Sequence, residues 1–257
     1  MTSLEALLAW PLLAPVVGIL VIAALTHGTL GFGFPVISTP MIALLTDVQT
    51  AVIATLIPNL VVNTISIVRG GEWRHSIAKY WQVPVYVLIG TIVGSQVLLV
   101  ANPAPIKLLL AAMIVVYLQQ RRFRGVDWAW LRRHPHLSGM VFGLLGGFLS
   151  GTVNVALPPL LIYFMALGLG AMAMTQILNL CFLVGRSAQA ITFGIAGKFG
   201  VSIMVATLPL TLVSVVALFA GIRLQRSIRP EAFDALLRKV LWAIAAILAL
   251  QAVWAFR

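Results

Sequence analysis

The feature that most constrains this chain is its series of long apolar segments, bounded by polar residues or by glycine and proline. A helix must hold about 20 consecutive apolar residues to cross a hydrocarbon core of about 30 Å. Of the 257 residues, 61% are hydrophobic and 9% are charged, at a mean hydropathy of +1.06. A soluble domain of this length cannot hide so much apolar surface. The sequence therefore predicts an all-α polytopic membrane protein.

The pattern predicts ten helical segments. They span residues 8–27, 33–46, 48–69, 80–100, 104–120, 138–152, 154–167, 170–193, 199–220 and 236–256. Most are long enough to cross a membrane. Segments 33–46, 138–152 and 154–167 are shorter, because about 15 residues at about 1.5 Å each reach only about 21 Å.

An internal repeat relates two glycine- and proline-rich stretches at the short segments. GTLGFGFPVISTP (28–40) aligns with GFLSGTVNVALPP (147–159), which sets Gly28 over Gly147. Five segments follow in the same order in each half. Since five is odd, the second half enters the membrane upside down relative to the first, as in many secondary transporters.

We therefore expect two inverted repeats of about five helical segments, each starting with a short broken hairpin. Residues 1–120 form the first repeat, residues 137–257 form the second, and residues 121–136 form a basic linker. The two hairpins are expected to enter from opposite faces and to meet near mid-depth.

The formal net charge of +11 is concentrated in three loops. Loops 69–79, 121–136 and 221–239 hold 13 of the 17 lysines and arginines: Arg69, Arg74, Lys79, Arg121, Arg122, Arg124, Arg132, Arg133, Arg223, Arg226, Arg229, Arg238 and Lys239. Ten segments place all three loops on one face, which the positive-inside rule makes cytoplasmic. Both termini are then periplasmic. Merging each short pair gives an eight-span alternative that moves loop 221–239 to the opposite face. The charge reflects this topology, and we expect no nucleic-acid partner.

The two interrupted stretches predict a binding site. Non-helical backbone is tolerated at membrane depth only where it is buried in protein or lines a cavity. A helix that starts after such a break presents unpaired N–H groups and a partial positive charge, which suit an anion. The alternative is that the glycines only allow close helix packing. The predicted substrate-binding residues are Thr29, Gly31, Phe32, Gly33, Phe34, Pro35, Ser38, Asn59, Asn63, Ser150, Gly151, Thr152, Asn154, Gln176, Asn179 and Arg186.

Polar residues in the following helices support this interpretation. Asn59 and Asn63 share one helix face at a spacing of four, and Gln176 and Asn179 share a face at a spacing of three. IPNLVVN (57–63) also aligns with ILNLCFL (177–183), so that Asn59 falls on Asn179. Any one of these amides could equally serve as interhelical glue.

Two titratable residues near the stretches have two interpretations each. Arg186 is a permanent charge inside a predicted span, and it either contacts the anion or snorkels to the membrane surface. His27 ends the first helix, where it could carry a coupling proton or act as a neutral helix-end hydrogen bonder.

The acidic residues exclude several function classes. The six of them, Glu5, Asp47, Glu72, Asp127, Glu231 and Asp234, fall at termini or in loops. A mid-membrane carboxylate relay for cations is therefore absent from the sequence, which favours an anionic substrate. The chain has no HExxH, nucleophile elbow or P-loop motif, so we expect no enzyme activity, no cofactor and no metal site.

Two sequence blocks resemble those of a known family. TLGFGFPVISTPMIALLTDVQTAVIATLIPNLVVN (29–63) and GGFLSGTVNVALPPLLIYFMALG (146–168) are similar to the signature blocks of the TauE/SafE sulfite exporter family, also called the TSUP permeases. The resemblance implies transport of small sulfur-containing or carboxylic anions, such as sulfite, thiosulfate, sulfoacetate or aromatic sulfonates, across the bacterial inner membrane. The second block departs from its relatives at Val153, Asn154 and Val155, where many of them have glycine.

We therefore expect a secondary transporter that moves a small anion, such as sulfite or an organosulfonate, by alternating access. An anion channel and a non-transporting membrane accessory protein are the alternatives. Export could be passive, since the inside-negative potential drives anions outward by about 2.3 kcal/mol per charge per 100 mV. Import would require a coupling ion such as H⁺, with His27 as its carrier.

Overall fold

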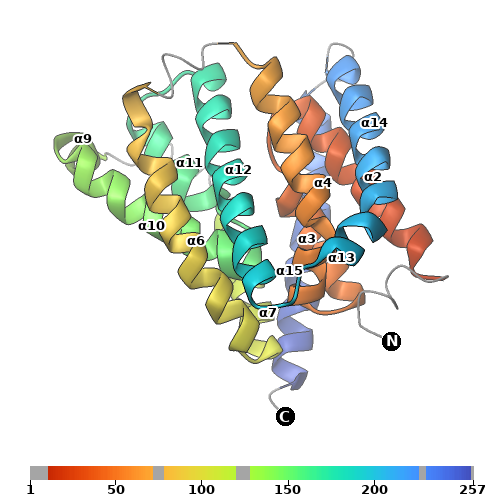
Figure 1. Ribbon diagram of the computed structural model, residues 1–257. Coiled ribbons are helices and arrows are strands. Elements are labelled where there is room, and N and C mark those ends of the chain that lie inside the picture. Colours follow the sequence, from red (N-terminus) through yellow and green to blue (C-terminus); the bar gives the residue numbers. More distant parts are fainter. Residues whose placement is uncertain (1–10, 72–77, 120–127, 226–229, 256–257) are drawn as a thin grey trace.

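The protein is all-helical in the computed structural model, which describes residues 11–71, 78–119, 128–225 and 230–255. No strand occurs in these ranges. The helices are α2 (Leu13–Leu30), α3 (Phe34–Leu45), α4 (Val48–Arg69), α6 (Gln82–Val100), α7 (Pro103–Leu118), α9 (Ala129–Arg133), α10 (Pro135–Val153), α11 (Leu157–Ala166), α12 (Ala171–Ile195), α13 (Val201–Ala206), α14 (Leu208–Leu224) and α15 (Pro230–Ala255) (Figure 1).

The predicted all-α membrane protein is confirmed. Among the described residues, α2, α4, α6, α10 and α12 are long and apolar enough to cross a membrane. The ten predicted segments occur in the predicted order. Helix α9 is an addition between the halves. Segment 199–220 is divided at Thr207 into α13 and α14, where Pro209 removes a backbone N–H from the first turn of α14.

Proline and glycine explain where the short helices begin and end. Helices α3 and α11 have 12 and 10 residues, so they are as short as predicted. Helix α10, expected over 138–152, has 19 residues, because Pro135 fits the first helical position and starts it earlier. Helix α2 continues past residue 27 to Leu30. The interruptions therefore shrink to residues 31–33 and 154–156.

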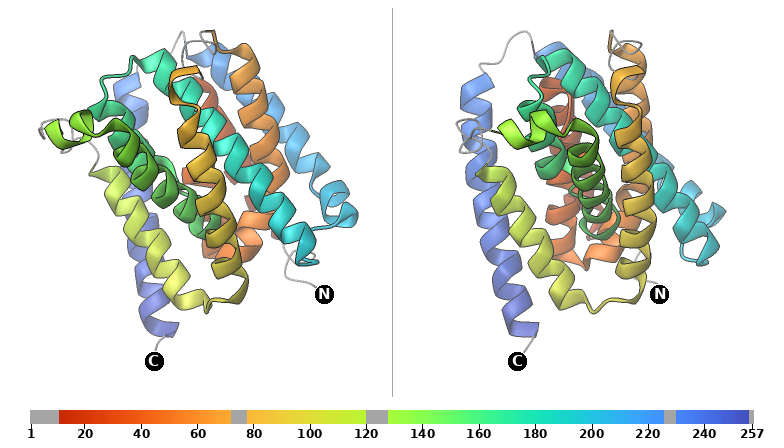
Figure 2. Two further views of the ribbon diagram at one scale, coloured as in Figure 1. Left: turned by 60° about the vertical axis from the view of Figure 1, so that its left-hand side comes forward. Right: turned by 90° about the vertical axis from the view of Figure 1, so that its left-hand side faces the viewer.

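The tightest helix pairs join one half of the chain to the other. Helix α10 runs against α6, α14 runs against α2, and α15 runs against α7 (Figure 2). Helices α4 and α12 also pack together. The halves 1–120 and 137–257 thus interlock and do not form separate bodies.

Glycines allow the backbones of α6 and α10 to touch. A Cβ atom on Gly94 would lie 2.2 Å from the carbonyl oxygen of Phe148, and one on Gly151 would lie 2.4 Å from that of Thr91. Real Cβ contacts are never this short, so these positions admit only glycine at this helix separation. The glycine-packing alternative is confirmed for Gly151, and its predicted part in the binding site stays a prediction.

The crossing of α2 and α14 has the same construction. A Cβ atom on Gly28 would lie 2.4 Å from the carbonyl oxygen of Leu218, and one on Gly221 would lie 2.4 Å from that of Leu25. Gly147 also belongs to the α6–α10 crossing, since a Cβ atom there would lie 2.2 Å from the carbonyl oxygen of Val87. The sequence alignment of Gly28 with Gly147 stays a prediction. The matched crossings support the inverted repeat, which stays a prediction.

The helix ends that flank the basic loops 69–79 and 221–239 lie at one end of the molecule (Figure 1). Helices α4 and α14 finish there and α6 and α12 start there, whereas α2 starts and α15 finishes at the opposite end (Figure 1). This agrees with the ten-segment topology over the described residues. Arg74, Arg121, Arg122, Arg124, Arg226 and Arg229 of the predicted basic loops lie outside the described residues.

Candidate functional site

The first interruption is built by two glycines in left-handed conformation. Helix α2 ends at Gly31, which has φ 83° and donates its N–H to the carbonyl oxygen of His27 at 2.7 Å. Gly33, with φ 109°, precedes α3, and Pro35 occupies the first turn of that helix. Glycine takes such φ values without a steric penalty, so the chain reverses within three residues.

The second interruption uses an asparagine instead. Helix α10 ends at Asn154, the one non-glycine residue with positive φ (62°) in the described part of the chain. The N–H of Asn154 donates to the carbonyl oxygen of Ser150 at 3.2 Å, and that of Val155 donates to the carbonyl oxygen of Leu149 at 3.4 Å, so two carbonyls of the last turns of α10 gain partners. Gly31 and Asn154 are thus both left-handed ends of interrupted helices.

The side chain of Asn154 ties the two hairpins together. Its Nδ2 donates to Thr39 Oγ1 of α3 at 2.6 Å and to Thr55 Oγ1 of α4 at 3.4 Å. Asn59 Nδ2 of α4 donates to Asn154 Oδ1 at 3.5 Å. We define Thr39, Thr55, Asn59, Asn63 and Asn154 as the polar centre, and none of these residues is more than 2% exposed.

Asn63 completes the polar centre from within α4. Its Nδ2 donates to the backbone oxygen of Asn59 at 2.8 Å and to Asn59 Oδ1 at 2.6 Å. The Oδ1 of Asn63 is buried without a hydrogen-bond partner. The predicted shared face of Asn59 and Asn63 is confirmed, and it retains hydrogen-bonding capacity.

Asn179 performs the corresponding task at the first interruption. Its Nδ2 donates to the carbonyl oxygen of Gly31 at 2.8 Å and to that of Thr175 at 2.9 Å, and its Oδ1 has no partner. Asn59, on α4, reaches the interruption of the second half, whereas Asn179, on α12, reaches that of the first. Each long helix therefore holds the broken hairpin of the other half.

Arg186 clamps the end of α10. Its Nη2 donates to the carbonyl oxygen and to the Oγ of Ser150, both at 2.5 Å, and its Nη1 donates to Gln189 Oε1. Gln189 Nε2 donates to the carbonyl oxygen of Gly151 at 2.9 Å. These carbonyls belong to the last turn of α10, where a helix carries partial negative charge. Arg186 is 1% exposed, so the snorkelling interpretation is wrong.

The clamp includes no carboxylate among the described residues. The carboxylate of Asp47, at the start of α4, accepts hydrogen bonds from Thr50 N and Oγ1 at 2.9 and 2.6 Å. The hydrogen-bond acceptors around the Arg186 guanidinium are therefore uncharged: the carbonyl and hydroxyl oxygens of Ser150 and the amide oxygen of Gln189. Its predicted contact with an anion stays a prediction.

His27 lies buried one turn before Gly31. Its Nε2 lies 2.9 Å from Ser66 Oγ of α4, and its Nδ1 has no partner. This contact suits the helix-end hydrogen bonder of the sequence analysis. The proton-carrying role stays a prediction.

The remaining predicted residues are three with hydroxyl groups, one amide and two phenylalanines. Three hydroxyls bond back to their own helices: Thr29 to Thr26, Ser38 to Phe34, and Thr152 to Phe148, at 2.8–2.9 Å. Gln176 is buried beside Gly70, and its Oε1 lacks a partner. Phe34 is fully buried in the apolar core, and Phe32 packs against that core.

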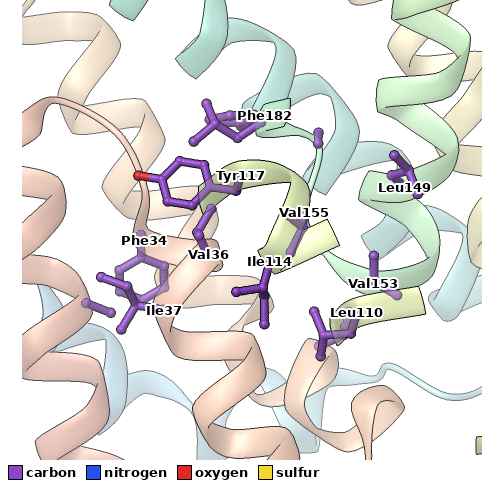
Figure 3. Packing of buried hydrophobic residues seen from close by; sticks show 14 of the residues in the cluster. Phe34, Val36, Ile37, Leu110, Ile114, Tyr117, Leu149, Val153, Val155 and Phe182 are labelled. Carbon is purple, nitrogen blue, oxygen red and sulfur yellow. The ribbon is translucent and has the colours of Figure 1, made fainter. Parts of the chain in front are cut away.

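Apolar side chains close the space around the two interruptions. Phe34 and Val36 of α3 lie near Val155 of the second interruption, with Ile114 of α7 and Phe182 of α12 beside them (Figure 3). All five are buried. The polar centre is thus buried in the protein interior among apolar side chains.

Several residues of the site were not predicted. Thr55, Ser66 and Gln189 contact Asn154, His27 and Arg186, respectively. A helical signal was present in the sequence, because Thr55 precedes Asn59 by four residues and Gln189 follows Arg186 by three. Among the described residues, no group of three or more His, Cys, Asp or Glu side chains gathers to hold a metal ion.

Comparison with known proteins gives one result. The family model described as Sulfite exporter TauE/SafE matches residues 16–252. The searches of curated proteins and of solved structures found no match.

Proposed function

Because the chain belongs to the TauE/SafE sulfite exporter family of membrane transporters, we propose that it moves a small anion across the bacterial inner membrane by alternating access. The observation that carries this proposal is the buried polar centre, built where two interrupted helices from opposite halves are joined through Asn154 and Thr39. Sulfite and organosulfonates such as sulfoacetate are the proposed substrates, with related sulfur-containing or carboxylic anions beside them.

The starts of the half-helices supply donors for an anion. Neither α3 nor α11 has a side-chain cap. Pro35, Pro158 and Pro159 carry no N–H, so the N–H groups of Phe34 and Leu157 are the first ones that each helix offers. Side-chain amides of the polar centre would add to these two N–H groups when the apolar residues part.

The local charge favours an anion over a cation. The Arg186 guanidinium contacts Ser150, which precedes Asn154 by one helical turn of α10. No described carboxylate neutralises the charge of Arg186. A cation would be repelled there, whereas an anion would relieve the cost of a buried unpaired charge.

The orientation and energetics follow from the basic loops. With these loops in the cytoplasm, both termini are periplasmic, and the membrane potential drives an anion outward. Import would require a coupling ion, and His27, one turn from the first interruption, is the proposed proton carrier.

Counterflow in proteoliposomes tests the proposal. Vesicles containing the purified protein are loaded with unlabelled sulfite and diluted into labelled sulfite. A carrier exchanges the two anions, so that the label accumulates transiently and its uptake saturates. Sulfoacetate, thiosulfate and acetate, loaded in turn, rank the substrates. Flux that neither saturates nor responds to anion on the far side would indicate a channel. The absence of flux for every anion would support an accessory protein.

A further inference from the structure

A second candidate site lies at the end of the bundle where the basic loops gather. A pocket of about 210 Å³ opens between the starts of α6 and α10 and is closed behind by Tyr163 of α11. Its lining residues are Lys79, Tyr80, Gln82, Val83, Tyr86, Pro135, His136, Gly139 and Tyr163. None of them belongs to the polar centre, so this pocket is separate from the transport site.

The polar lining of the pocket suits an anionic group. Lys79 and His136 are exposed at its rim, and Lys79 Nζ lies 5.4 Å from the centre of the Tyr80 ring. His136 Nδ1 lies 3.0 Å from Gln82 Oε1, which leaves Nε2 of the ring for another partner. Tyr163 donates its hydroxyl to the carbonyl oxygen of Pro135 at 3.0 Å and so fixes the start of α10.

A helix start and an arginine add positive potential. Helix α10 begins at the pocket without a side-chain cap, so the partial positive charge of its start faces the pocket. Arg133, exposed in the last turn of α9, adds positive charge at this end of the molecule. No Asp or Glu is among the described residues that line the pocket.

The apolar surroundings indicate that the anion is attached to a lipid. Beside the pocket, α6 exposes Val85 and Ile89, and α10 exposes Leu137 and Val141. Trp130, half exposed on α9, is the kind of side chain that anchors a protein at the membrane interface. A free phosphate ion would use only the polar lining, whereas a phospholipid would also cover this apolar surface with its acyl chains.

We propose that this pocket binds the phosphate headgroup of an anionic phospholipid from the cytoplasmic leaflet. Lys79 and His136 contact the phosphate, the start of α10 supplies backbone N–H groups, and the acyl chains lie along Val85, Ile89 and Val141. Basic pockets between transmembrane helices on the cytoplasmic side are suited to such headgroups.

Native mass spectrometry of the delipidated full-length protein tests the site. Dioleoyl phosphatidylglycerol is titrated against dioleoyl phosphatidylcholine, which has the same chains without net charge. We expect at least about tenfold tighter binding of the first bound phosphatidylglycerol, and the loss of that difference in Lys79→Gln/His136→Gln. Lys79→Arg should keep it. Lys198→Gln, which removes a cation near α13 at the opposite end, is the matched control and should bind like the wild type.

Three results would overturn the proposal. Equal affinity for the two lipids would remove the anionic preference. Unchanged phosphatidylglycerol binding in Lys79→Gln/His136→Gln would place the bound lipid elsewhere. Binding of inorganic phosphate that saturates the pocket and displaces phosphatidylglycerol would assign the site to a soluble anion. Size-exclusion chromatography of each variant checks that it is folded.

Discussion

At the scale of single residues, Asn154 combines two properties that Gly31 does not. Both residues take a left-handed conformation at the end of an interrupted helix. Asparagine tolerates this region because its short polar side chain can bond locally, and it also brings an amide into the protein interior. That amide contacts Thr39, Thr55 and Asn59, so one side chain both shapes the interruption and joins it to the first half.

Asn154→Gly separates these two properties. Glycine keeps the backbone conformation and removes the amide, so we expect sulfite counterflow to fall at least about tenfold with a stability loss of about 1 kcal/mol. Asn154→Ala should lose about 1 kcal/mol more, because alanine at φ 62° is strained. Thermal unfolding and proteoliposome flux measure the two effects. Thr64→Ala, at an exposed position of α4, is the control and should match the wild type. Wild-type flux in Asn154→Gly would exclude the amide from the site.

Substitution of Arg186 by lysine or by methionine separates its hydrogen bonds, which affect stability, from its charge, which affects sulfite binding. Lysine retains the charge but cannot bridge Ser150 and Gln189, whereas methionine loses both the charge and the bridge. We expect both variants to lower stability by about 1–3 kcal/mol, because the α10 carbonyls lose donors. Arg186→Met alone should also raise the KM for sulfite strongly. An equal KM in the two variants would limit Arg186 to a clamp on α10, and unchanged melting temperatures would contradict the clamp.

At the scale of helices, the sequence indicates where helices begin and end, but it does not indicate which helices contact each other. The short helices α3 and α11 were predicted because proline and glycine act within a few residues of where they stand. The start of α10 at Pro135 was missed, because helix length was judged from hydropathy and the first turn is polar. The bond between Asn59 and Asn154 spans 95 residues of sequence, and no local pattern encodes it. The contact between Arg186 and Ser150 is also distant in sequence, so the sequence did not decide between anion contact and snorkelling for Arg186.

The α6–α10 crossing depends on the absence of side chains. Gly94→Ala would set a Cβ atom 2.2 Å from the carbonyl oxygen of Phe148, and backbone cannot yield as a flexible side chain does. We expect a loss of about 1–3 kcal/mol from overpacking. Gly18→Ala in α2, where nothing lies within 4 Å, should instead be neutral or gain up to about 1 kcal/mol. Thermal unfolding in one detergent compares the two variants. A tolerated Gly94→Ala would show that the helices can separate at little cost.

At the scale of the whole molecule, the glycine crossings define which helices move together. Helices α6 and α10 are held backbone to backbone, and so are α2 and α14, although each pair takes one helix from either half. Rocking of residues 1–120 against residues 137–257 would break the backbone contacts of both crossings. For the proposed alternating access we therefore expect a displacement of the α2–α14 pair relative to the α6–α10 pair, with the polar centre opening between them.

Distances between spin labels test whether the α2–α14 pair moves relative to the α6–α10 pair. Labels on Val93 of α6 and Leu145 of α10, both exposed to lipid, should keep their distance when sulfite is added. Labels on Val93 and on Ile22 of α2 should change theirs, because they belong to different pairs. Pulsed electron paramagnetic resonance measures both distributions in nanodiscs. If the Val93–Leu145 distance changes and the Val93–Ile22 distance does not, residues 1–120 move against residues 137–257 instead.

The crossings also bear on how such a chain could have arisen. A polypeptide that ended near residue 120 would carry the glycine face of α2 and that of α6 with nothing to cover either. A second copy lying the other way up in the bilayer would cover both. If the predicted inverted repeat holds, a half-length ancestor would have needed to insert in both orientations and to dimerise antiparallel before any gene duplication could fuse the two copies.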